Sequence, residues 1–147
     1  MLTDYYGNAL STSTGLARDN YDIGLRAFLS ANYGAEEAFS QAVEADPNFA
    51  LAYLGLARSF MTSGQLNEAK IALKKAKNVL SGSTEREKSH FLCCELILSG
   101  ASAKAKASVD KHVSEWPRDA MIAQMNTSVF GLIGFSGKVG REIDLLE

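Results

Sequence analysis

The chain has 147 residues and a formal net charge of −2, with 46% hydrophobic and 22% charged residues. This composition is that of a globular domain able to bury a core, and the lack of a basic excess excludes the phosphate-binding surface that nucleic acids require. The sequence contains no run of about 18 apolar residues, the length needed to cross a bilayer. The amino terminus lacks the features of a signal peptide. The adjacent Cys93 and Cys94 cannot join distant segments. We therefore expect a cytoplasmic protein with neither nucleic-acid nor membrane partners.

The first 13 residues are polar and show no helical period, so we expect an arm or a loop over residues 1–13. A helix is predicted from Thr14, whose hydroxyl can cap its start, to about Tyr33. Within it, large apolar residues recur at the spacing of one helix face: Leu16, Tyr21, Leu25, Phe28 and Leu29. Gly34 is expected to end this helix, because glycine readily adopts the left-handed conformation that follows many helices.

The clearest unit of the chain runs from Pro47 to Ser81 and contains two amphipathic stretches separated by Ser63-Gly64-Gln65. Its small and large apolar residues have the spacing of a helical hairpin of roughly 34 residues: Tyr53, Leu56, Ala57, Phe60, Ala69, Leu73 and Ala76. A helix over residues 35–45, ended by Asp46-Pro47, carries the same pattern one repeat earlier. The first hairpin is therefore interpreted as a repeat with a degenerate leading helix. Ile23, Gly24 and Arg26 occupy positions at which the later repeats have residues that match the pattern better.

A third hairpin follows if Pro117 is taken as its closing proline, and the turn before it contains a predicted capping box, Thr84 with Glu87. A fourth hairpin begins at Arg118, and the chain stops at Glu147 in the middle of its pattern. We therefore expect a fragment of a longer protein, or another element that covers this end. The predicted fold class is all-α, a right-handed α-α superhelix of about three and a half hairpins, 14–47, 48–81, 86–117 and 118–147.

The spacing of the apolar residues from Tyr53 to Ala76 and the Asp46-Pro47 close resemble the tetratricopeptide repeat family. Short motifs along nearly the whole chain are similar to the amino-terminal part of the tetratricopeptide repeat protein 38 family: LSTST from Leu10, YDIGL from Tyr21, ADPNF from Ala45, TEREKSHF from Thr84 and WPRDAM from Trp116. Members of that family are longer and carry further hairpins. The family has no established catalytic residues, so the resemblance implies a scaffold.

Four residues could bind a metal or act as nucleophiles, namely His90, Cys93, Cys94 and His112. His90 and Cys94 lie four residues apart and share a helix face, but two ligands are too few for a structural zinc. Cys93 and His112 fall at packing positions, where His112 is expected to fill space and make one hydrogen bond. The glycines from Gly131 to Gly140 lack the preceding strand of a phosphate-binding loop. No carboxylate pair lies in an apolar setting, and we expect no catalytic residue, no metal, no cofactor and no enzyme.

The leading helix of each hairpin is expected to line a concave groove that holds a peptide or an amphipathic helix. The repeat register places in this groove Leu54, Arg58, Met61, His90, Phe91, Cys94, Leu98, Gln124, Met125 and Ser128. The groove is mostly apolar, and its methionines can adapt to different partners. Only Arg58 could pair strongly with a carboxylate, so a clamp for the carboxylate end of a chaperone is not expected.

Three kinds of occupant fit this groove: a partner protein or peptide, a second copy of the chain, or the protein's own amino-terminal or missing carboxy-terminal segment. Two other functions stay open at this point. The alternative hypothesis is a helical accessory domain of a longer enzyme or transporter component whose active residues lie beyond residue 147. It is, as a third possibility, a small-ligand or metal binder that uses His90 and Cys94.

Overall fold

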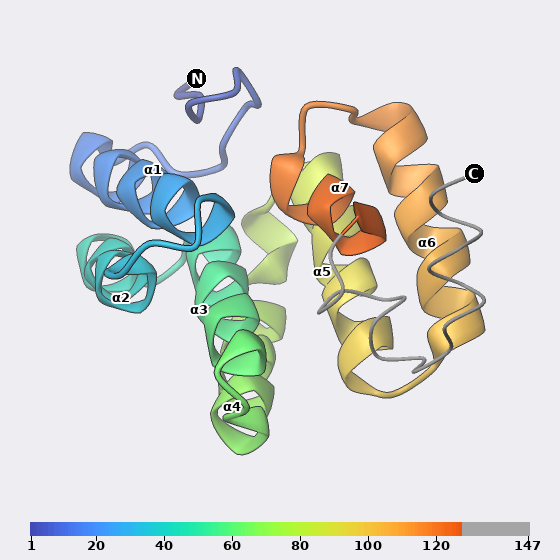
Figure 1. The fold of residues 1–147 in the computed structure, drawn as a ribbon. Coiled ribbons are helices and arrows are strands. Elements are labelled where there is room, and N and C mark those ends of the chain that lie inside the picture. The colour runs from blue at the N-terminus through green and yellow to red at the C-terminus, as the bar shows by residue number, and fades with distance from the viewer. Residues whose placement is uncertain (128–147) are drawn as a thin grey trace.

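A computed structural model describes residues 1–127, and every regular element in that range is a helix (Figure 1). In chain order these elements are α1 Gly15–Leu29, α2 Ala35–Ala45, α3 Ala50–Thr62, α4 Leu66–Asn78, the short 3₁₀ helix η1 Leu80–Gly82, α5 Glu85–Leu98, α6 Ser102–Glu115 and α7 Ala120–Thr127. The prediction of an all-α fold is confirmed. No helix within residues 1–127 combines the length and the apolar character needed to cross a bilayer.

The helices pack as antiparallel hairpins, and each trailing helix also contacts the next leading helix. The hairpins are α1 with α2, α3 with α4, and α5 with α6, while α2 packs on α3, α4 on α5 and α6 on α7. The leading helices form the inner layer, because α3 contacts both α1 and α5 and α1 reaches α7 (Figure 1). This stacking is that of a helical-repeat superhelix. Within residues 1–127 this packing gives three hairpins followed by α7.

The first helix is shorter than predicted, because it ends at Leu29 and not near Tyr33. Ala31 adopts a φ of 57°, and the N–H of Asn32 donates back into the last turn of α1. These two features form the Schellman geometry that commonly ends helices, with alanine in the place of the usual glycine. Gly34 has a φ of 98° and directly precedes α2, which spans the predicted residues.

The second hairpin has the two helices and the connecting turn that the sequence predicts. Gly64 in this turn has a φ of 78°, and the N–H of Gln65 donates to the Phe60 carbonyl at 2.8 Å. Glycine is needed here because the left-handed conformation strains residues with a Cβ.

The two predicted helix caps have different outcomes. Thr14 directly precedes α1, but its side chain makes no cap hydrogen bond. The capping box at the start of α5 is confirmed: the Thr84 hydroxyl accepts from the Glu87 N–H, and the Glu87 carboxylate accepts from the Thr84 N–H at 2.8 Å.

Phe39 of α2 lies at the centre of the apolar core of the first three helices and has no exposed surface. Its ring fits between two glycines, since a Cβ at Gly24 of α1 would lie 2.7 Å from the ring and a Cβ at Gly55 of α3 would lie 2.5 Å from it. The ring of Tyr21 packs against Phe39 with the centroids 5.6 Å apart. Gly24 is therefore required for the close approach of α1 to Phe39, a role that the interpretation of a degenerate helix did not include.

The amino-terminal arm, residues 1–13, is packed against the edge of the superhelix that carries the inter-repeat turns (Figure 1). It holds one isolated antiparallel bridge, between Thr3 and Ala9, and it buries Leu10 completely. Its hydrogen bonds reach the first and third hairpins and the turn before α7: Thr12 donates to Asp46 at 2.6 Å, the Ser11 N–H to Glu87 at 3.1 Å and the Asn8 side chain to the Arg118 carbonyl at 2.9 Å, while the Tyr5 N–H donates to Asp22 at 2.9 Å. The arm therefore connects the first hairpin to the third.

Candidate functional site

A cavity of about 510 Å³ lies between the four leading helices, near the carboxyl ends of α1, α3 and α5. Its walls are the turn of residues 31–36 together with Phe28, Arg58, Ser59, Met61, Thr62, Ser63, Ile97, Gln124 and Met125. The volume falls within the roughly 300–1,000 Å³ of specific ligand sites. The cavity is the place where segments from all four leading helices meet on one concave surface.

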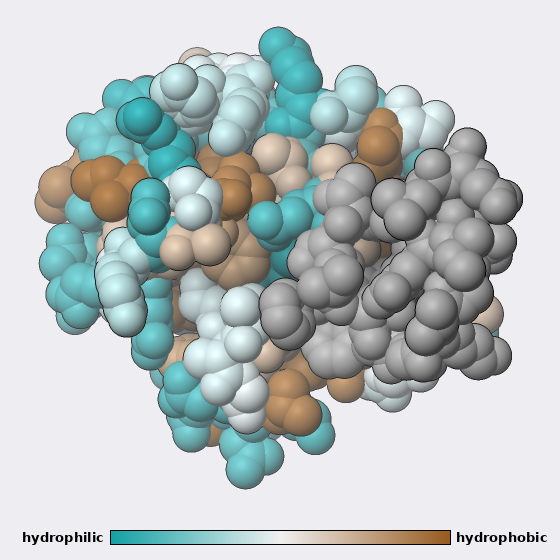
Figure 2. Space-filling model, viewed as in Figure 1, coloured by the Kyte–Doolittle hydropathy of each residue, from teal (hydrophilic) through white to brown (hydrophobic). Residues whose placement is uncertain are grey.

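The other exposed apolar side chains are scattered over the outer surface. Figure 2 shows brown patches over α1 and at the lower end of the α3–α4 hairpin. Exposed hydrophobic residues on these helices include Leu16 and Ile23 of α1 and Leu66 and Ile71 of α4. Single exposed apolar residues are normal on soluble proteins and need no ligand to explain them.

The predicted groove residues separate into two groups in the structure. Arg58, Met61, Gln124 and Met125 line the cavity. Four others, Leu54, His90, Phe91 and Cys94, are at most 5% exposed and belong to the interior behind it. Leu98 is partly buried and stands outside the cavity wall, and Ser128 lies outside the described residues.

The cavity wall carries a buried cation, the guanidinium of Arg58. Its Nη1 donates to the Met121 carbonyl at 2.9 Å, its Nη2 is 3.5 Å from the Gln124 side-chain oxygen, and its Cζ lies 5.1 Å from the centre of the Phe28 ring. Burial lowers the pKa of Arg58 from its usual value. The side chain thus connects α3 to α1 and to α7 at the cavity.

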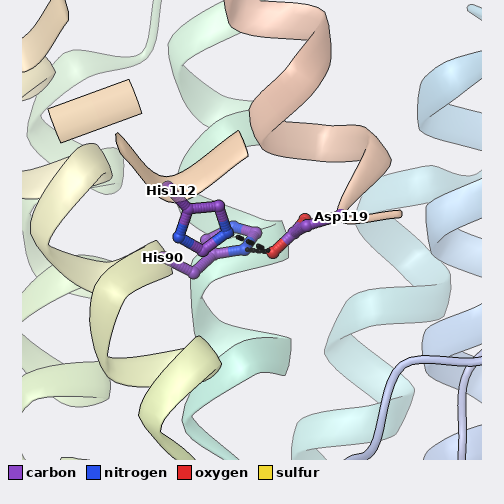
Figure 3. A group of neighbouring side chains, drawn as sticks. All are labelled: His90, His112 and Asp119. Atoms are coloured by element: carbon purple, nitrogen blue, oxygen red, sulfur yellow. Dashed lines mark hydrogen bonds and ion pairs between the residues drawn. The ribbon is translucent and has the colours of Figure 1, made fainter. Parts of the chain in front are cut away.

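A second polar group, the Asp119 cluster, lies in the interior between α5, α6 and the start of α7. One oxygen of Asp119, Oδ2, is 2.8 Å from Arg86 Nη1, 3.0 Å from His90 Nδ1 and 2.8 Å from His112 Nε2. Figure 3 shows both imidazoles directed at this carboxylate. Each of the four side chains is at least nine-tenths buried.

The hydrogen bonds of the cluster assign its protons. His90 Nδ1 and His112 Nε2 each donate to Asp119, and His112 Nδ1 accepts from the Ser89 hydroxyl at 2.8 Å. Burial raises the pKa of the Asp119 carboxyl, but its interactions with His90, His112 and Arg86 outweigh burial and hold that pKa well below the usual range. The cluster is therefore an ionised carboxylate held by three donors from two helices.

The same three residues have the ligand types of a metal site, since the ligand atoms of His90, His112 and Asp119 lie within 4.8 Å of one another. Two features make these three residues a poor site for a metal cation. The Arg86 guanidinium already lies 2.8 Å from the shared carboxylate oxygen and would repel it. Metal binding through Nδ1 of His90 would also leave a proton on its Nε2, which is buried and has no hydrogen-bond partner within residues 1–127. The geometry fits a hydrogen-bonded network better than a metal centre.

The predicted pair of His90 and Cys94 does not act as a unit in this network. Cys94 is buried, and burial raises the pKa of its thiol to about 12, which keeps it protonated and unreactive. His112 makes two hydrogen bonds, to Ser89 and Asp119, where one was expected. The sequence interpretation missed Asp119 and Arg86 altogether.

A signal for Asp119 is nevertheless present in the repeat register. Asp119 follows Pro117 by two residues, as Phe49 follows Pro47, and Phe49 is completely buried. A carboxylate at a position that another repeat fills with a buried aromatic residue requires a buried partner. That partner is supplied by Arg86, His90 and His112.

The buried His90 predicts a fall in stability with acid. Burial lowers its pKa, and Asp119 offsets this only in part, whereas an unfolded histidine titrates near about 6.5. The unfolded chain therefore binds more protons below that pH, and we expect the free energy of unfolding to decline from about pH 6.5 downward. Asp119 adds a separate loss only below about pH 3.9, because its folded pKa is depressed.

Urea unfolding followed by circular dichroism at a series of pH values measures this decline. The matched variant is His90→Asn, whose amide nitrogen stands near the position of Nδ1 and does not titrate. Its stability is expected to change less between about pH 7 and about pH 5 than that of the wild type. An equal decline in both proteins would assign the titrating group elsewhere.

Comparison with known proteins gives a match for one part of the chain. Residues 34–84 match the family model described as tetratricopeptide repeat. The matched range covers α2, α3 and α4 and supports a place for these three helices in that superfamily, whose repeats generally mediate contacts between proteins. Neither the curated proteins nor the solved structures give a significant match to the chain.

Proposed function

We propose that this chain is a non-catalytic interaction scaffold that holds a peptide or an amphipathic helix of a partner protein in the cavity between its leading helices. The supporting observation is the cavity itself, which joins residues of α1, α3, α5 and α7 in one concave wall. Repeat proteins use the surface formed by successive leading helices for binding, because insertion of a partner there contacts several repeats at once.

The chemistry of the wall supports an apolar ligand face. Phe28, Met61, Ile97 and Met125 supply hydrophobic surface, and methionine side chains adapt to partners of different shape. Among the described residues of the wall there is no histidine or cysteine, and Glu36 is the one carboxylate. The hydroxyls of Ser59, Thr62 and Ser63 in the wall donate to backbone carbonyls and not to a base, which favours binding over chemistry.

A single substitution in the wall tests the proposal. Met61→Glu is expected to weaken peptide binding at least tenfold, because it places a charge where apolar side chains of the ligand are to be buried. The matched control is Ile71→Glu, which adds the same charge at a half-exposed position of α4 outside the cavity. Affinities for amphipathic peptides selected from a library are measured by fluorescence polarisation, and thermal unfolding confirms that both variants are folded.

Equal weakening by both variants would contradict binding in the cavity. Size-exclusion chromatography with light scattering measures the molar mass of the chain in solution. A dimer would indicate that the wall is buried against a second copy and not against a partner protein. A monomer that binds none of the library peptides would also contradict the proposal.

A further inference from the structure

Two arginines of this chain are equally buried but have opposite electrostatic surroundings. Arg86 and Arg58 are 5% and 6% exposed. Arg86 forms an ion pair with Asp119 at 2.8 Å, and this carboxylate outweighs the effect of burial and raises the pKa of Arg86. Among the described residues, the hydrogen-bond acceptors of Arg58 are a backbone carbonyl and an amide oxygen, and its pKa is lowered by burial.

Within residues 1–127, no Asp or Glu side chain lies at ion-pair distance from Arg58. A buried cation without an anion is costly, and buried charges in native proteins are generally paired. Arg58 differs from an ordinary core arginine because it forms part of the cavity wall. An anion within the cavity would therefore reach it without any rearrangement of the helices.

The other residues of the wall restrict which kind of anion would fit beside Arg58. In the part of the wall that the structure describes, the other charged residue is Glu36, which is exposed at the start of α2. Around Arg58 the wall is formed by Phe28, Met61 and Met125, so a strongly hydrated polyanion would lose its water against apolar surface. A single carboxylate between apolar side chains fits both the cation and its surroundings.

We infer that Arg58 is the anion anchor of the cavity and that the occupant is an amphipathic helix of a partner protein with one Asp or Glu set within its apolar face. This inference rests on the proposed function, because it assigns the chemistry of the peptide that the cavity holds. The guanidinium would form a charge-assisted hydrogen bond with the ligand carboxylate, and apolar neighbours on the ligand would contact Met61 and Met125.

The test uses three acetylated and amidated helical peptides of about 14 residues. The first carries Glu within its Leu and Met stripe, the second carries Gln at that place, and the third has the composition of the first with Glu moved to the polar face. Fluorescence polarisation against the full chain is expected to show the first peptide binding on the order of tenfold more tightly than the other two. The third peptide controls for net charge.

Substitution of Arg58 should remove this preference. In Arg58→Gln the three affinities are expected to become equal, and Arg58→Lys should retain part of the preference because it keeps the cation. The matched control Lys75→Gln removes an exposed positive charge of α4 outside the cavity and should leave the ratio unchanged. If Arg58→Gln does not fold, the comparison of the three peptides on the wild type still tests whether the cavity prefers a carboxylate within the apolar face of its ligand.

The outcomes separate the two proposals. Equal binding of all three peptides to the wild type overturns the anchor and leaves the proposed function intact. Failure of every amphipathic peptide to bind overturns the proposed function itself. The sequence after residue 127 contains Glu142, Asp144 and Glu147. If a full-length variant with Gln, Asn and Gln at these positions binds the first peptide more tightly than the wild type, the anion comes from this chain and the assignment to a partner is wrong.

Discussion

Asp119→Asn is expected to lower the free energy of unfolding by about 3–5 kcal/mol, the usual cost of leaving one member of a buried ion pair without its partner. The variant keeps the shape of the side chain but removes the negative charge that holds Arg86, His90 and His112. Urea unfolding near neutral pH, followed by circular dichroism, measures the loss. The surface control is Asp19→Asn, whose ion pair with Arg18 is exposed and whose removal should cost at most about 1 kcal/mol.

A second substitution distinguishes charge from packing at Asp119. Adding Arg86→Met to Asp119→Asn removes the unpaired cation and replaces it with an apolar side chain of similar length. Part of the lost stability should return, because replacing both members of a buried pair is far less costly than breaking it. A double variant as unstable as the sum of its single changes would show that the ionic interaction is not what the cluster contributes.

Gly55→Ala should destabilise the protein by about 1–2 kcal/mol, although alanine favours helices by about 1 kcal/mol over glycine. The added methyl group would lie 2.5 Å from the ring of Phe39, which is fully buried and also contacts Gly24 on its other side. Overpacking of this kind typically costs about 1–3 kcal/mol, so the steric term exceeds the gain in helix propensity. Chemical denaturation of the purified variant measures the difference.

Two further variants test the steric explanation. Phe39→Leu should reduce the effect of Gly55→Ala when the two are combined, because the smaller side chain leaves room for the methyl group. Gly15→Ala, at a helix position with no atoms near its missing Cβ, should be neutral or slightly stabilising. Loss of stability in Gly15→Ala equal to that in Gly55→Ala would argue against the close contact as the cause.

The helices of this fold were largely predictable because they depend on local spacing. The bounds of α2, the turn at Gly64 and the capping box at Thr84 follow from residues at most four positions apart, and the structure contains all three. The end of α1 was missed because Ala31 adopts the left-handed conformation that sequence rules assign to glycine. Local rules fail where an unfavourable residue is held in place by the remainder of the fold.

The interior polar contacts were not predictable in this way. Asp119 is bonded to Arg86 and His90 across 33 and 29 residues, and helical periodicity contains no information on which charged side chains meet at such separations. The groove residues show the same limit. The repeat register assigned Leu54 and Arg58 to one inner face, but Leu54 is enclosed, while the longer Arg58 side chain reaches the cavity wall and donates to the Met121 carbonyl of α7.

The amino-terminal arm changes how the chain is expected to fold during synthesis. In a simple array each repeat contacts only its neighbours, so hairpins can form one after another as they leave the ribosome. Here Ser11 and Asn8 bind residues 76 and 110 positions later, so the arm, which is made before the hairpins, is among the last segments to dock. Until the turn before α7 has emerged, the Asn8 side chain lacks one of its partners, the Arg118 carbonyl. These contacts close a loop of about 110 residues and join the first and third hairpins into one cooperative unit. We therefore expect the arm to dock after the hairpins that follow it in the sequence have formed.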